Sequence, residues 1–194
     1  MATLVLLRHG QTEWSRDGRH TSRTDVPLTD VGRDQARALR PAAQAFRFGL
    51  VLTSPRQRAA ETARLAGLDA TPDENLVEWD YGEYEGETTP EINAGLDEPW
   101  NMWLEGAPGG EAAAEVGRRI DQVLERVAPV LAAGEDVCLV AHGHSLRVVT
   151  ARWLDLEPSD GALFKLDTGT VCELGLEHAR HVVLGWNVPA AAYV

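Results

Sequence analysis

The stretch Leu4-Val5-Leu6-Leu7-Arg8-His9-Gly10 decides the fold, because a continuous apolar run ending in polar residues is typical of a buried parallel strand at its carboxyl end. In open α/β sheets, ligands bind just beyond the carboxyl ends of the strands. A histidine can act as a nucleophile toward phosphorus, and a guanidinium is well shaped to hold phosphate oxygens. Arg8 and His9 therefore predict phosphoryl transfer at this strand end.

Strand and helix patterns alternate along most of the chain, which predicts an α/β fold. We expect strands at 3–7, 50–53 and 137–141, and helices at 29–46, 55–66, near 89–95, 110–133 and 145–154. This alternation predicts a three-layer α/β/α sandwich with a mostly parallel central sheet and helices on both faces. The ranges 162–166, 171–176 and 181–186 resemble strands joined by turns at 167–169 and 177–179, and predict an antiparallel C-terminal extension. We expect residues 1–194 to form a single domain.

A second candidate phosphate contact follows the apolar segment 50–52. Ser54 is expected to cap the next helix and Pro55 to be its first residue, which places Arg58 in the first turn. The helix dipole disfavours a cation there, so the arginine is better explained by an anion that binds at the same helix end.

A third strand end carries His142-Gly143-His144-Ser145 after the apolar run 137–141. Two histidines this close together can also ligate a metal. We expect no metal, because the sequence has no HExxH motif and no cysteine pair at ligand spacing. The arginines expected at the same place would also repel a cation.

The acidic and aromatic segment 76–86 supplies a candidate proton donor. Cleavage of a phosphate ester requires a proton for the leaving oxygen, and a partly buried carboxylic acid can provide it. Glu78 is the best candidate because it directly follows apolar Leu76-Val77, whereas Glu83 and Glu85 are expected to be solvated loop charges. Tryptophans 79, 100 and 103 cluster around this segment and could form an apolar wall for a substrate.

These motifs together resemble the histidine phosphatase superfamily, in its metal-independent, phosphoglycerate mutase-like branch. The resemblance follows the family's order from residue 4 to about 145. It is carried by Leu7-Arg8-His9-Gly10-Gln11-Thr12-Glu13-Trp14, by residues 23–32, by Ser54-Pro55-Arg56-Gln57-Arg58 with residues 59–63, by Glu78 with Tyr81-Gly82 and Glu85-Gly86, and by Ala141-His142-Gly143.

The resemblance implies a role for each of these residues. His9 would carry the phosphoryl group as phosphohistidine, with Arg8, Arg58 and His142 around the phosphate and Glu78 as proton donor. No cofactor is implied. Further residues fall where relatives contact the phosphate or the rest of the substrate, namely Ser15, Thr21, Ser22, Tyr81, Gly143 and His144.

Within the family, the sequence favours a phosphatase over a mutase. Glu13-Trp14-Ser15 and residues 24–29 resemble a subgroup with actinobacterial acid phosphatases and fungal sedoheptulose-bisphosphatase-like enzymes. Dedicated mutases carry a basic segment after the catalytic glutamate, whereas residues 83–110 here contain no Lys or Arg and several acidic residues. An acidic lid would repel a bisphosphate. A bisphosphoglycerate-dependent phosphoglycerate mutase and a non-catalytic binder of a phosphorylated ligand are the alternatives.

The composition and net charge limit the classes of partner that the protein can bind. The chain has 194 residues, 44% of them hydrophobic, and a formal net charge of −12, which argues against nucleic acid or an anionic membrane surface. It contains no apolar run of membrane length, and the expected strand follows Met1 almost at once, so we expect no signal peptide and a cytoplasmic protein. A small phosphorylated metabolite is the expected partner. The oligomeric state is left open, with a homodimer among the possibilities.

Overall fold

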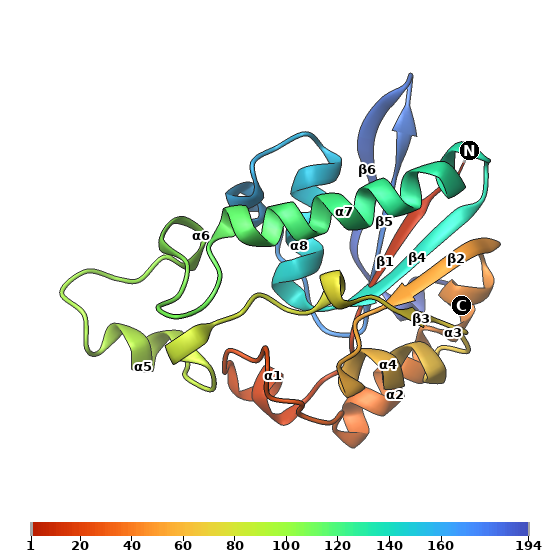
Figure 1. Ribbon diagram of the computed structural model, residues 1–194. Coiled ribbons are helices and arrows are strands. Elements are labelled where there is room, and N and C mark those ends of the chain that lie inside the picture. The colour runs from red at the N-terminus through yellow and green to blue at the C-terminus, as the bar shows by residue number, and fades with distance from the viewer. Residues whose placement is uncertain (1, 194) are drawn as a thin grey trace.

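The computed structural model describes residues 2–193, and a six-stranded sheet in the order β3-β2-β4-β1-β5-β6 lies at its centre (Figure 1). Strands β3, β2, β4 and β1 pair in parallel, whereas β5 and β6 add an antiparallel extension. This arrangement confirms the predicted sheet, although β3 is too short for its pattern to be detected. The strands are β1 (Leu4–Arg8), β2 (Phe48–Thr53), β3 (Thr71–Pro72), β4 (Asp136–Ala141), β5 (Thr170–Glu177) and β6 (Arg180–Pro189).

Helices cover both faces of this sheet. Leu4 and Leu6 of β1 pack into one apolar cluster, which includes residues of α7 (Ala113–Ala132) and α8 (Gly143–Trp153). Val5 and Leu7 point the other way, into a cluster with α3 (Arg40–Gln44) and α4 (Gln57–Leu65). Successive side chains of a strand face opposite sides of the sheet, so a strand that is apolar at every position needs helices on both faces. The predicted three-layer sandwich is therefore confirmed.

The predicted helix 29–46 is divided in the structure. It forms α2 (Asp30–Ala38) and α3, which meet at Leu39. Pro41 lies at the start of α3, where its missing N–H removes the hydrogen bond that would have continued α2. Thr29 caps α2, its hydroxyl accepting from the Gly32 N–H at 3.0 Å.

The predicted start of α4 was wrong by two residues. The helix begins at Gln57, and Arg56 rather than Ser54 occupies the N-cap position, without a side-chain cap. The Ser54 hydroxyl lies 2.8 Å from Nε2 of His142 instead. Arg58 nevertheless stays in the first turn, as expected.

The predicted strand at 162–166 was also wrong. Residues Pro158–Leu163 form the 3₁₀ helix η3, and the following segment leads to β5 without joining the sheet. The two other predicted strands are present and form the β5–β6 hairpin, which turns at His178 and Ala179. Both turn residues have positive φ, at 47° and 64°, as tight hairpin turns require.

The segment between β3 and α7 contains only short elements and extends to the left of the sheet in Figure 1. Another short helix, α1, directly follows β1 and the His9 turn. Across residues 2–193, no helix is both long and apolar enough to cross a membrane. The short elements are α1 (Glu13–Asp17), η1 (Glu74–Leu76), η2 (Gly82–Tyr84), α5 (Thr89–Asn93) and α6 (Met102–Glu105), and η4 (Ala190–Tyr193) ends the described chain.

Candidate active site

The parallel pairing of β1 with β4 brings two of the predicted histidines together. Arg8 lies opposite Ala141 in the register, and the His9 N–H donates to the Ala141 carbonyl at 3.0 Å. His9 and His142 each follow one of these strand ends, and their rings lie 5.1 Å apart, edge to face. The first and third strand-end motifs therefore form one site.

His9 is held in the tautomer that a nucleophile needs. Its Nδ1 lies 2.7 Å from the Gly10 carbonyl oxygen, and because a carbonyl can only accept, Nδ1 carries the hydrogen. Nε2 therefore keeps its lone pair. Burial, followed by the positive charges of Arg58 and Arg8, holds the pKa of His9 well below its usual value. The imidazole is thus neutral at neutral pH, with its lone pair on Nε2.

Arg58 is fully buried and is fixed beside this pair by hydrogen bonds. Its Nε donates to Nδ1 of His142 at 3.1 Å, and its other nitrogens donate to the carbonyls of Thr21, Ser22 and Thr24. His142 must therefore carry its hydrogen on Nε2, which donates to Ser54 Oγ. Burial, reinforced by Arg58, lowers the pKa of His142 well below normal, so this ring is also neutral.

Glu78 caps the N-terminus of α8. Its carboxylate accepts the N–H groups of His144 at 3.0 Å and Ser145 at 2.8 Å, as well as that of Trp79 at 2.9 Å. A carboxylate has about four lone-pair positions, so these three donors leave one position on Oε2 unoccupied. Glu78 is 5% exposed and lines the cavity, which agrees with the burial expected for it.

Tyr81 and His144 form a neutral hydrogen-bonded pair next to Glu78. The Tyr81 hydroxyl lies 2.6 Å from Nδ1 of His144. Burial raises the pKa of Tyr81 well above its usual value and lowers that of His144 well below, so the hydroxyl donates and the imidazole accepts. Nδ1 of His144 lies 3.9 Å from the Glu78 carboxylate.

Two arginines are oriented by backbone carbonyls of the segment 161–166. Arg8 donates to the Leu166 carbonyl, and Arg147 donates to the carbonyls of Gly161 at 2.9 Å and Ala162 at 3.1 Å. The buried Nε of Arg8 has no hydrogen-bond partner among the residues described.

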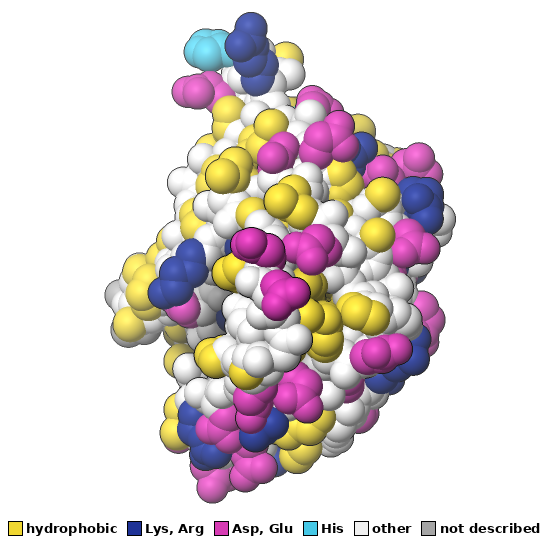
Figure 2. All heavy atoms as spheres, turned by 90° about the vertical axis from the view of Figure 1, so that its left-hand side faces the viewer, with side chains coloured by type: hydrophobic (Ala, Val, Ile, Leu, Met, Phe, Trp, Pro, Cys, Tyr) yellow, Lys and Arg dark blue, Asp and Glu magenta, His cyan; other side chains and the backbone are white. Residues whose placement is uncertain are grey.

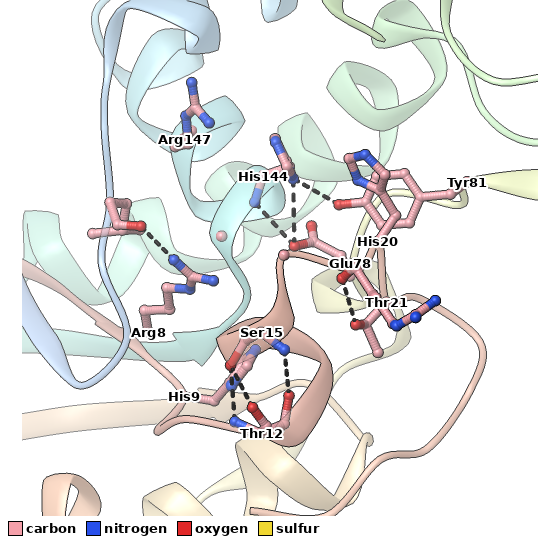
Figure 3. A pocket seen from close by; sticks show the side chains of 14 residues that line it. Arg8, His9, Thr12, Ser15, His20, Thr21, Glu78, Tyr81, His144 and Arg147 are labelled. Carbon is pink, nitrogen blue, oxygen red and sulfur yellow. Dashed lines mark hydrogen bonds and ion pairs between the residues drawn. The ribbon is translucent and has the colours of Figure 1, made fainter. Parts of the chain in front are cut away.

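These side chains surround a cavity of about 190 Å³. Arg8 and Arg147 lie on one side of it, with His20, Thr21 and Tyr81 on the other (Figure 3). Its walls include eight of the predicted site residues: Arg8, His9, Ser15, Thr21, Glu78, Tyr81, Gly143 and His144. Arg58 and His142 lie behind His9 and do not line the cavity.

The smaller predicted contacts differ in their surroundings. The Ser15 hydroxyl completes the cap of α1 with Thr12, and the Thr21 hydroxyl donates to the Arg19 carbonyl, although both residues line the cavity. Ser22 is buried and donates to the Glu78 carbonyl at 3.3 Å, outside the cavity lining. Glu85 is not a solvated loop charge as predicted, because it accepts the backbone N–H groups of Ser22 and Thr24.

Sequence reasoning missed further residues of the wall: Thr12, Gly18, Arg19, His20, Arg147 and Leu166. A signal for Arg147 was present, because it follows Gly143 by four residues and so lies one helical turn from the start of α8. Within residues 2–193, no group of three or more His, Cys, Asp or Glu side chains is placed to hold a metal ion.

Comparisons with known proteins agree with this geometry. The family model of the histidine phosphatase superfamily (branch 1) matches residues 4–189. An acid phosphatase of Mycobacterium tuberculosis is 42% identical over 179 residues, which cover 90% of this chain and 87% of that protein. Sedoheptulose 1,7-bisphosphatase of Saccharomyces cerevisiae is 33% identical over 219 residues, which cover 92% and 80%.

A solved structure shares the whole fold. The product of an open reading frame of Mycobacterium tuberculosis superimposes with a TM-score of 0.93 at 38% identity, covering 97% of this chain and 98% of that one. The resemblance noted in the sequence is thereby confirmed. The chain belongs to branch 1 of the histidine phosphatase superfamily, and it is a phosphatase that acts on phosphorylated metabolites.

Proposed function

We propose that the protein is a metal-independent phosphomonoesterase that hydrolyses a small phosphorylated metabolite through a phosphohistidine on His9. The observation that carries this proposal is the tautomer of His9, whose Nδ1–H is bound to the Gly10 carbonyl while Nε2 keeps a free lone pair in a cavity shared with Glu78. A buried neutral imidazole beside fixed arginines is suited to attack phosphorus.

The reaction has two steps. In the first, Nε2 of His9 forms a bond to phosphorus, the phosphorus–oxygen bond to the leaving group breaks, and Glu78 gives its proton to the departing oxygen. In the second, Glu78 accepts a proton from water, the water oxygen attacks phosphorus, and the bond to Nε2 breaks to release inorganic phosphate. Arg8 supplies an unpaired N–H to the phosphate, and Arg58 adds positive charge beside His9.

The remaining predicted contacts would act on the rest of the substrate. Ser15, Thr21, Tyr81 and His144 are proposed to contact it from the cavity wall. Gly143 lets the backbone approach Arg8, because a Cβ at this position would lie 3.2 Å from Cζ of Arg8. Ser22 is proposed to act indirectly, through its bond to the Glu78 carbonyl.

A phosphoglycerate mutase is the second candidate, favoured by Arg19 and Arg147 in the cavity wall, where they could hold a second phosphate. Both guanidiniums already have partners in the protein. Arg19 donates to the Gly86 carbonyl and lies 3.8 Å from Glu91, and Arg147 is bound by two carbonyls. The acidic segment further disfavours a bisphosphate, so the phosphatase is preferred.

The test is phosphate release from a panel of phosphomonoesters in excess EDTA, with His9→Ala alongside and acid-labile labelled phosphate measured on the protein. We expect release that ignores EDTA, and both release and labelling lost in His9→Ala. Appreciable release by the variant would exclude His9 as nucleophile. Conversion of 3-phosphoglycerate with a bisphosphoglycerate primer, without phosphate release, would assign the mutase reaction instead.

The role of Glu78 has its own test, in which kcat/KM is compared between leaving groups. Glu78→Gln removes the proton donor, so we expect kcat/KM to fall about a hundredfold for alkyl and sugar phosphates, whose leaving oxygens need a proton. An activated aryl phosphate should lose far less. Exposed Glu83, as Glu83→Gln, is the matched control. Equal losses on both substrate classes would assign the acid to another residue.

A further inference from the structure

We propose that the catalytic cavity continues into a second chamber, which receives the leaving group of the substrate, and that this group carries an uncharged, flat-faced ring. The inference rests on the proposed phosphatase reaction and specifies its substrate class. The chamber has a volume of about 330 Å³ and opens to solvent on the side of exposed Thr89 and Asn101. Its walls include His20, Thr89, Trp100, Asn101, Trp103 and His144.

The chamber and the catalytic cavity adjoin each other. His20 and His144 line both, and Tyr81, whose ring lies 4.7 Å from that of His20, belongs to the wall on the catalytic side. These imidazoles therefore form the boundary between the two spaces, and a group attached to a phosphate at His9 would pass beside them to reach the chamber. A cavity of about 150 Å³ is enough to hold benzene. The chamber is thus large enough for a ring with substituents.

Two indoles form rigid walls of this chamber. Trp103 is held from outside, because the Arg147 guanidinium lies 4.5 Å from the centre of its ring and Trp79 packs edge-on at 5.4 Å. Trp100 is 8% exposed and donates its indole N–H to the Gly106 carbonyl at 2.7 Å. Aromatic walls that are already fixed bury a flat ring with little further loss of side-chain entropy.

The polar groups of the chamber suit a neutral ligand. Burial lowers the pKa of both His20 and His144, so both rings are uncharged at neutral pH. Thr89 and Asn101 add a hydroxyl and an amide. Within residues 2–193, no Lys, Arg, Asp or Glu lines the chamber. The wall can therefore bind hydroxyl groups and apolar faces, but it offers nothing to neutralise a second anion.

The outer surface reinforces this preference. The segment 83–110 that supplies Thr89, Trp100 and Trp103 also carries exposed carboxylates, and acidic side chains are scattered over the face that α5 and α6 present (Figure 2). They include Glu87, Glu91, Asp97, Glu98 and Glu105. Their potential disfavours an additional negative charge on the leaving group. Arg147 does not line the chamber; its guanidinium stacks on Trp103 and lines the catalytic cavity instead.

The proposal is tested by filling the chamber. Thr89→Trp places a bulky side chain in it from the first turn of α5, and Ala94→Trp, at an exposed position after the same helix, is the matched control. The substrates are naphthyl phosphate, glucose 6-phosphate, ethyl phosphate and 3-phosphoglycerate. We expect Thr89→Trp to lower kcat/KM for a ring substrate roughly tenfold more than for ethyl phosphate, mainly through KM. The naphthyl and glucose arms distinguish an aromatic ring from a sugar.

A second pair of variants tests the chamber independently in case Thr89→Trp does not fold. Trp103→Ala should show the same selective loss, and Trp103→Phe, which keeps a flat wall, should recover most of it. Equal losses for ethyl phosphate and both ring substrates would exclude the chamber as the binding site of the leaving group, without contradicting the proposed phosphatase activity. A loss that is greatest for 3-phosphoglycerate would contradict the proposal that the leaving group is uncharged. If the wild-type protein releases no phosphate from any substrate in a His9-dependent way, the proposed function itself fails.

Discussion

The histidines of the site show what can be learned from single residues. His9 and His142 were predicted because each follows an apolar strand, and Arg58 and Glu78 because each follows an apolar segment. The sequence could not predict the tautomers, since these depend on the Gly10 carbonyl at 2.7 Å from one ring and on Arg58 at 3.1 Å from the other. It also assigned Ser54 to a helix cap, because its partner, His142, is distant in sequence.

The buried neutral state of His142 predicts a pH-dependent stability. Its pKa in the folded protein lies well below the reference value of 6.5, so the unfolded chain takes up the proton first as pH falls. The stability that neutral His142 contributes is therefore fully present above pH 6.5, and it is lost as the pH falls toward the pKa of His142 in the folded protein. His142→Asn removes this titrating group. Between pH 7 and pH 5, we therefore expect the free energy of unfolding of the variant to fall by about 1–2 kcal/mol less than that of the wild type.

Urea unfolding at several pH values measures this difference. His178→Asn, at the exposed hairpin turn, is the control for loss of a histidine. The same pH dependence in His142→Asn and in the wild type would show that His142 is not buried in its neutral form.

At the scale of elements, the start of α8 matters most for the site. The sequence predicted a helix from 145, whereas the structure begins it at Gly143. The two additional residues place the His144 and Ser145 N–H groups on Glu78 and bring Gly143 against Arg8. Helix ends are poorly defined by apolar periodicity, and here a carboxylate from a distant segment provides the cap.

Gly143→Ala is expected to separate activity from stability. An added Cβ would lie 3.2 Å from Cζ of Arg8, so the guanidinium must shift by a few tenths of an ångström, whereas alanine itself favours a helix. We expect kcat/KM to fall roughly tenfold while Tm is unchanged or raised. Gly95→Ala, which would meet only the Ile92 carbonyl at 3.9 Å, is the control. A variant with full activity would mean that the position of Arg8 tolerates this displacement.

At the scale of the whole molecule, the three-layer sandwich and its antiparallel extension could be predicted because alternating strands and helices allow few arrangements. The segment between β3 and α7 could not be predicted in the same way. Its short helices are positioned by contacts with distant residues, such as Glu85 with Ser22 and Trp79 with Glu111. The wall of three tryptophans that the sequence suggested is present only in part, because Trp100 and Trp103 line the chamber whereas Trp79 is fully buried and does not.

The net charge of −12 predicts an effect of salt on substrate choice. Replacing Glu87, Asp97 and Glu98 by their amides removes repulsion near the site, so we expect kcat/KM for 3-phosphoglycerate to rise about two- to threefold more than that for ethyl phosphate at low ionic strength. The difference should vanish in high salt. The control replaces Asp69, Glu125 and Glu135 by their amides. Asp69 and Glu135 precede the amino ends of β3 and β4, whereas the site lies at the carboxyl ends of the strands, and Glu125 lies in α7. Equal effects of both triple variants would indicate only a general charge effect.

The segment 161–166 orients Arg147 and Arg8 through the backbone carbonyls of Gly161, Ala162 and Leu166. Side-chain substitutions do not remove these carbonyl oxygens. Alanine scanning keeps every backbone oxygen, so it reports only on side chains, such as that of buried Leu166 and the missing Cβ of Gly161, which would lie 2.5 Å from the Trp103 ring. The length of the segment matters as well. Deleting one residue between Ala162 and Leu166 would change the spacing between the oxygens that hold Arg147 and the one that holds Arg8, so the segment depends on its residue count as well as on the identities of Gly161 and Leu166.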